Sequence, residues 1–162
     1  MRRCFVLTGF ITFLFLLTSC SAQEGPKQQG ASPAVEFSLE SIKEQTINLS
    51  EYRGEGAVIL LFWTTWCPYC INEIEMLNQL YEELGKDNVR VLAIDAGESL
   101  RTVKRYMRQI GPKFDVLLDR NLKVSGAYRI NGVPFYIFID KQGGIVSKGN
   151  YFPSNYKQLS AE

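Results

Sequence analysis

Two cysteines, Cys67 and Cys70, are the residues whose type and spacing most clearly indicate chemistry in this chain. They follow an apolar run at residues 57–63 and open a segment with helical periodicity. At the start of a helix, positions three apart share one face, so the two thiols can form a disulfide with little backbone movement. The helix dipole favours negative charge on the first sulfur, so Cys67 should ionise more readily than a free thiol. Because thiolates attack disulfides, the pair predicts thiol–disulfide exchange.

The composition limits the other chemistries. The chain has 162 residues, 46% of them hydrophobic, which is enough for one domain with a buried core, and it contains no histidine. Haem attachment through C-x-x-C-H is excluded, since Ile71 stands at the histidine position, and so is a Cys/His zinc site. A formal net charge of +1 gives no reason to expect a nucleic-acid partner. We therefore expect no cofactor, no metal and no nucleic acid.

The first residues have the composition of an export signal. Arg2 and Arg3 precede about fourteen mostly apolar residues, fewer than the roughly twenty of a spanning helix. The run ends in Leu-Thr-Ser-Cys at residues 17–20, which resembles the lipobox of bacterial lipoproteins. The resemblance implies cleavage before Cys20 and lipidation of its sulfur. The alternatives are an ordinary signal peptide with a chance cysteine, or an uncleaved anchor.

This pattern predicts three segments and a location. A lipoprotein signal peptide covers residues 1–19, a lipidated cysteine and flexible tether cover 20–33, and one domain covers 34–162. The tether is rich in Gly, Gln, Ser and Pro and has no apolar periodicity. Two or three acyl chains hold a protein stably at a membrane. We therefore expect a domain held at a membrane of the bacterial cell envelope, facing the periplasm or the cell exterior.

Strands alternate with helices along the predicted domain. Apolar runs and apolar–polar alternation predict strands at residues 35–39, 46–49, 57–63, 89–94, 116–118, 135–139 and 145–147. Helical spacing predicts helices at residues 71–84, 100–110 and 121–128. The result is an α/β fold with a central mixed β-sheet flanked by helices. Residues 154–159 leave room for only a turn or two of a final helix.

Four short motifs carry a family resemblance. They are the segment around Trp-Cys-Pro-Tyr-Cys at residues 62–73, Gly97-Glu98-Ser99, Ala127-Tyr128 and Gly132-Val133-Pro134. Together they resemble the thioredoxin superfamily and, within it, the TlpA/ResA branch of membrane-attached thiol–disulfide oxidoreductases. The resemblance spans about residues 35–149. It implies a thioredoxin-like fold with an N-terminal β-hairpin extension and, in this chain, a shortened C-terminal helix, so that either the domain is trimmed or a partner covers an apolar face.

Chemistry and resemblance together imply the roles of the site residues. Cys67 is expected to be the exposed nucleophile that forms a mixed disulfide, and the more buried Cys70 resolves it, leaving the Cys67–Cys70 disulfide. The resemblance implies a cis bond between Val133 and Pro134, packed against the cysteines, with Val133 pairing with the substrate chain. Trp66 is expected to form part of the docking surface. The alternatives are a structural disulfide, an ordinary turn proline and a packing aromatic.

Glu73 is a further candidate, because it lies three residues after Cys70 on the same helix face. In the TlpA/ResA branch a glutamate at this place is linked to proton transfer at the cysteines. The alternative is an acid favoured by the helix dipole and pointing to water. Leu61 occupies the position where thioredoxin has a buried aspartate, which strengthens the case for Glu73. Phe135 and Tyr136 stand where the branch often has small hydroxyl residues, which indicates a different partner surface.

The sequence thus predicts a lipid-anchored thiol–disulfide oxidoreductase that reduces protein disulfides. The resemblance implies disulfide-bearing client proteins, with apocytochrome c in cytochrome c maturation as one candidate, and a membrane thiol transporter as electron donor. Two other classes stay open. Thr64-x-x-Cys67 mimics part of a peroxiredoxin site, the signature of a thiol peroxidase, although Leu60 stands where that family has proline. The chain could also be a non-catalytic interaction module with the same fold.

Overall fold

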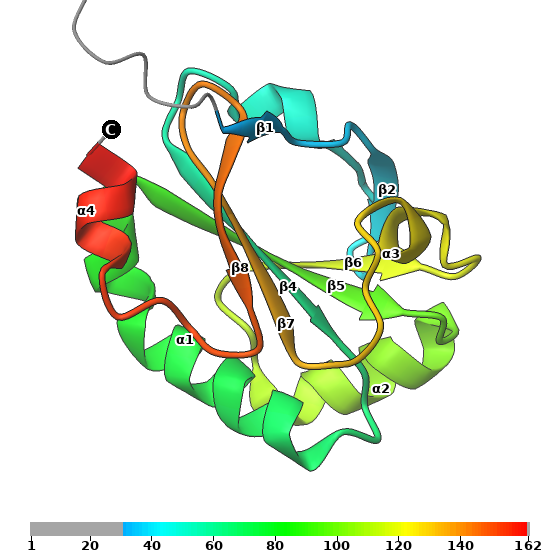
Figure 1. The fold of residues 1–162 in the computed structure, drawn as a ribbon. Coiled ribbons are helices and arrows are strands. Elements are labelled where there is room, and N and C mark those ends of the chain that lie inside the picture. The colour runs from blue at the N-terminus through cyan, green and yellow to red at the C-terminus, as the bar shows by residue number, and fades with distance from the viewer. Residues whose placement is uncertain (1–30, 162) are drawn as a thin grey trace, which may run out of the picture.

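The structure, a computed structural model, describes residues 31–161, and a mixed sheet lies at the centre of this region (Figure 1). The eight strands of the sheet have the order β1-β8-β7-β4-β5-β6-β2-β3. The neighbours β4, β5 and β6 run parallel, whereas β7 and β8 pair antiparallel. The thioredoxin-like arrangement predicted from the sequence is confirmed.

The elements follow one another closely along the chain. The strands are β1 (Ser32–Pro33), β2 (Ser38–Ser41), β3 (Thr46–Asn48), β4 (Ala57–Trp63), β5 (Val89–Ala96), β6 (Asp115–Asp119), β7 (Phe135–Ile139) and β8 (Gly144–Gly149). The helices are the 3-10 turn η1 (Leu49–Tyr52), α1 (Pro68–Lys86), α2 (Leu100–Ile110), α3 (Lys123–Ala127) and α4 (Tyr156–Ala161).

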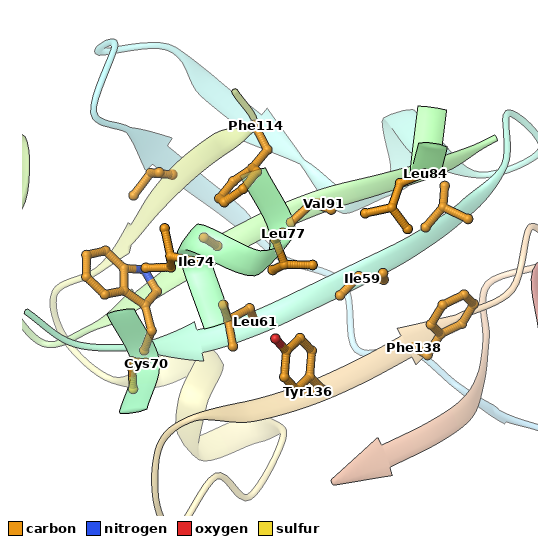
Figure 2. Packing of buried hydrophobic residues seen from close by; sticks show 14 of the residues in the cluster. Ile59, Leu61, Cys70, Ile74, Leu77, Leu84, Val91, Phe114, Tyr136 and Phe138 are labelled. Atoms are coloured by element: carbon orange, nitrogen blue, oxygen red, sulfur yellow. The ribbon is translucent and has the colours of Figure 1, made fainter. Parts of the chain in front are cut away.

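The burial of strand β4 shows that the sheet is covered on both faces. All seven of its residues are buried, as expected for a strand between two layers. Because side chains alternate along a strand, Ile59 and Leu61 join the core beneath α1 and α2, whereas Leu60 and Phe62 join the core beneath α3. Figure 2 shows Ile59, Leu61 and residues of α1 in the first of these cores.

Two elements begin later in the chain than the sequence pattern predicts. The strand expected at residues 35–39 is β2, three residues further on, because Val35 O accepts a hydrogen bond from the Tyr128 hydroxyl instead of entering a ladder. Helix α3 begins two residues later than expected, because Leu122 has a left-handed φ of 57°. The Asp119 carboxylate accepts the amide hydrogen of Ser125 at 2.7 Å and so fixes this start.

The short C-terminal helix closes one edge of the first core. Tyr156 is 7% exposed, and its ring lies 5.2 Å from that of Phe152, which meets Tyr136 edge-on at 5.9 Å. The Tyr156 hydroxyl donates to Asp87 at the end of α1, and Lys157 pairs with Glu83 of the same helix. Phe152 and Tyr156 of this segment thus pack with the first core.

The N-terminal part of the domain starts earlier than the expected boundary at residue 34. Ser32 and Pro33, assigned to the tether by composition, pair with Ile145 and Gly144 of β8. The predicted signal peptide, Cys20 and most of the tether lie outside the described residues. Between residues 31 and 161, no helix has the length and apolar character needed to cross a membrane.

Candidate active site

The two cysteines lie at the start of α1, directly beyond the end of β4. Cys67 is the N-cap of the helix, and Pro68 occupies the first helical position, where its missing N–H costs nothing. The Cys67 sulfur accepts the Cys70 amide hydrogen at an N–S distance of 3.2 Å. A cap position supplies backbone N–H groups and the positive end of the helix dipole, so negative charge on this sulfur is stabilised when the pair is reduced.

Cys67 and Cys70 form a disulfide, with their Cα atoms 5.3 Å apart. Cys67 is 5% exposed and Cys70 is completely buried. The relative order agrees with a leading and a resolving sulfur, but Cys67 is far more covered than the exposed nucleophile we expected. Solvent exposure is instead carried by its neighbours Trp66 and Tyr69, at 71% and 76%. A reaction partner therefore meets aromatic rings before it meets sulfur.

The Val133–Pro134 segment faces the disulfide. Its peptide bond is cis, as the resemblance implied. The Val133 carbonyl oxygen lies 3.7 Å from the Cys67 sulfur. In the disulfide this sulfur carries no proton, so the approach is a contact; in the reduced protein a Cys67 thiol would have an acceptor there.

Glu73 lies one turn after Cys70 and does not simply point to water. Its Oε2 accepts a hydrogen bond of 2.6 Å from the hydroxyl of Tyr136, a residue of β7 that is 2% exposed. Burial, and then the hydrogen bond to Glu73, raise the pKa of Tyr136 far above its usual value. The phenol therefore stays protonated and acts as the donor.

A groove lies at the start of α1, between residues of this helix, Pro134 and the segment after β8. It has a volume of about 300 Å³ and is lined by Tyr69, Asn72, Glu73, Pro134, Asn150 and Tyr151. Asn150 donates to the Pro134 carbonyl oxygen at 2.9 Å, which joins the segment after β8 to the cis-proline loop. Tyr151 is 83% exposed and continues the aromatic surface of Trp66 and Tyr69.

Sequence reasoning missed a pair of acids behind the loop that leads to Cys67. Glu98 accepts hydrogen bonds from the amide and the hydroxyl of Thr65, and its own amide donates to Asp95 Oδ1 at 2.8 Å. Gly97, with a φ of +98°, provides the tight turn between the two acids. One signal was available: Asp95 continues the alternation of Val91 and Ala93, so its side chain must point into the core.

Asp95 is fully buried, and its Oδ2 has no hydrogen-bond partner among the described groups. Burial, reinforced by the neighbouring Glu98, raises the pKa of Asp95 to about 8. Asp95 therefore carries its proton at neutral pH. Within residues 31–161, no group of three or more metal-ligating side chains comes together.

The arrangement defines a class: a thioredoxin-like protein with a C-x-x-C disulfide at a helix N-terminus and a cis-proline facing it. By sequence, the chain belongs to the AhpC/TSA family, whose model matches residues 31–148, and it is a thiol–disulfide oxidoreductase related to ResA. The ResA thiol–disulfide oxidoreductase of Bacillus thuringiensis (strain Al Hakam) is 32% identical over 143 residues, which are 88% of this chain and 81% of that protein. ResA of Halalkalibacterium halodurans is 38% identical over 113 residues, 70% of this chain and 64% of that one.

Solved structures show the same fold. A putative thiol:disulfide interchange protein DsbE from Chlorobium tepidum has a TM-score of 0.70 at 23% identity, covering 80% of this chain and 90% of its own. StoA from Bacillus subtilis has a TM-score of 0.65 at 22% identity, covering 78% and 98%.

Proposed function

We propose that this protein is a lipid-anchored reductant of protein disulfides in the bacterial cell envelope. The carrying observation is the difference between its two sulfurs. Cys67, at the helix cap, retains slight exposure and accepts an N–H hydrogen bond, whereas Cys70 is buried behind it. A cap sulfur is the one stabilised as a thiolate, and of the two cysteines only Cys67 retains any exposure.

The proposed reaction has two exchange steps. The Cys67 thiolate attacks a client disulfide, forms a mixed disulfide and releases the first client thiolate, which takes up a proton. The Cys70 thiolate then attacks the Cys67 sulfur and releases the second client thiolate. The client gains two electrons and two protons, and the protein is left with the Cys67–Cys70 disulfide. A dithiol donor, which we propose is a membrane thiol transporter, must then reduce it.

Neighbouring residues support docking and proton transfer in this scheme. Trp66 offers an exposed aromatic surface, and we propose that the Val133 backbone beside Pro134 pairs with an extended client chain, since its carbonyl oxygen lies 3.7 Å from the Cys67 sulfur. Glu73 is proposed to exchange a proton with the dithiol, because it lies on the same helix and lines the adjoining groove. Lipidation at Cys20 would hold the domain at the membrane.

The client class follows from a trapping experiment. In Cys70→Ser the second step is blocked, so clients should accumulate as mixed disulfides on Cys67. The full chain would be produced in a bacterial host, with Cys67→Ser/Cys70→Ser as control, and adducts that disappear on adding dithiothreitol would be identified. An apocytochrome c among them would assign the protein to cytochrome c maturation, and other envelope proteins would assign it to general disulfide reduction. A complete lack of adducts would overturn the proposal.

Two measurements separate the competing classes. A thiol peroxidase would react with hydrogen peroxide much faster than it reduces insulin, and we expect the reverse order. An inert interaction module would show an alkylation profile with the pKa of a free cysteine, about 8.5, whereas we expect the Cys67 profile to lie below it.

A further inference from the structure

We propose that Tyr136 is a positioning residue that holds the Glu73 carboxylate in place for the dithiol reaction. The inference rests on the proposed function, and it concerns a residue of the central sheet that lies outside the C-x-x-C segment. Its basis is the hydrogen bond of 2.6 Å between the Tyr136 hydroxyl and Glu73 Oε2.

The register of the sheet places Tyr136 beside an apolar residue of β4. Tyr136 of β7 pairs directly with Leu61 of β4, and both side chains point to the α1 face (Figure 2). Leu61 occupies the position at which, by the sequence resemblance, thioredoxin has a buried aspartate. The phenol reaches from the neighbouring strand past this leucine to Glu73 on the helix, so the polar group arrives from another strand.

Aromatic contacts also hold the phenol ring in place. The ring of Phe152 meets Tyr136 edge-on at 5.9 Å and packs against Tyr156 at 5.2 Å. Such pairs favour a defined ring orientation. Since Phe152 lies between β8 and α4, and Tyr156 begins α4, the C-terminal segment helps to set the direction in which the Tyr136 hydroxyl points.

The orientation of Glu73 decides where the groove carries its charge. Among the residues lining the groove, Glu73 is the only Asp, Glu, Lys or Arg, and the other titratable groups are the phenols Tyr69 and Tyr151. Glu73 forms no ion pair with any of residues 31–161, so the Tyr136 hydroxyl is the donor that fixes it. This hydrogen bond engages only Oε2. Because the carboxylate group is rigid, holding Oε2 also limits the positions that Oε1 can take.

The test compares two buried phenols that both donate to carboxylates. Tyr136→Phe keeps the ring and removes the hydroxyl beside Glu73, and Tyr156→Phe does the same beside Asp87, at the other end of α1. Wild type, both variants and Glu73→Gln would be reduced, and the rate at which Cys70 releases a client peptide from a mixed disulfide would be measured from pH 5 to 10. Thermal unfolding of each variant would be recorded beside it.

We expect Tyr136→Phe to slow release about five- to tenfold near pH 7 and to shift the midpoint of the pH profile, because a typical intramolecular hydrogen bond has a net effect of this size. Glu73→Gln should alter the same profile, and combining Tyr136→Phe with Glu73→Gln in one protein should add little to that change. Tyr156→Phe should match wild type. If Tyr136→Phe fails to fold, Phe152→Leu, which keeps the hydroxyl and removes its support, should shift the midpoint less in the same direction.

The outcomes separate the two levels of the hypothesis. If Tyr136→Phe or, in its place, Phe152→Leu gives the wild-type pH profile while Glu73→Gln does not, the positioning role is wrong and the proposed function stands. If Glu73→Gln also gives the wild-type profile, the positioning role is again wrong. If the wild-type protein itself performs no exchange, the proposed function fails.

Discussion

Glu98 holds Thr65 by two hydrogen bonds, one of 2.6 Å from the Thr65 amide and one of 2.7 Å from its hydroxyl. The two residues are 33 positions apart in sequence, and Thr65 stands two residues before Cys67. The loop that carries the nucleophile is therefore fastened to the end of the neighbouring strand β5.

Removing these two hydrogen bonds should lower the free energy of unfolding. Glu98→Ala leaves the Thr65 amide without its acceptor, and the loss of a charged hydrogen-bond partner costs about 1–3 kcal/mol. Urea unfolding of the oxidised protein would measure the change. Glu75→Ala, at an exposed position of α1, is the matched control and should stay within about 0.5 kcal/mol. Equal effects in the two variants would contradict the role of Glu98.

Asp95 should make stability fall as the pH rises. Its folded pKa is about 8, while an unfolded aspartate titrates near 3.9. Between these values the folded state binds the additional proton, so stability decreases with pH by up to about 1.4 kcal/mol per unit and levels off above pH 8.

Asp95→Asn should remove this slope, because the amide carries no charge and its oxygen can still accept the hydrogen bond from the Glu98 amide, whose nitrogen lies 2.8 Å from Asp95 Oδ1. Unfolding free energies from pH 4.5 to 8.5 would be compared with those of wild type and of Asp115→Asn, a partly exposed acid paired with Lys43. Parallel curves for Asp95→Asn and wild type would show that Asp95 does not hold its proton.

The exposed ring of Trp66 should matter for protein clients and not for small ones. Because it is 71% exposed, Trp66→Ala should change the unfolding free energy by less than about 0.5 kcal/mol. We expect KM for a protein disulfide to rise several-fold, while the rate with a small aromatic disulfide stays within twofold. Val35→Ala removes another exposed apolar side chain and serves as control. A loss shared by both substrates would argue against a docking role.

Two glycines should respond to alanine in opposite directions. At Gly56 an added Cβ would overlap the backbone oxygen of Asn88, so Gly56→Ala should cost about 1–3 kcal/mol. At Gly85, inside α1, nothing lies within 4 Å of the added atom. Gly85→Ala should therefore stabilise the protein by up to about 1 kcal/mol. Thermal and urea unfolding would check both, and a loss at Gly85 would contradict the helical assignment there.

The sequence was sufficient where chemistry and periodicity fall in one short segment. The apolar run of β4, the cysteine pair and the apolar stripe of α1 follow one another directly in the sequence. This order was enough to predict that Cys67 and Cys70 lie at the start of a helix after a buried strand. The contact between Glu73 and Tyr136 could not be predicted, because it depends on the register of β7 against β4 and on a helix crossing above both strands. The exposure of Cys67 was overestimated because its covering comes from Val133, far along the chain.

The pairing of β1 with β8 fixes the side from which the chain enters the domain. Ser32 and Pro33 lie beside Ile145 and Gly144, at the start of β8, whereas the far end of β8 and the start of β7 lie level with the end of β4 that leads to Cys67. Figure 1 shows β1 and the beginning of α1 at opposite ends of the molecule. A tether that joins Ser32 to the proposed lipid would thus attach at the end of the domain remote from the sulfurs. In that arrangement the disulfide would face away from the membrane, towards proteins that diffuse along it.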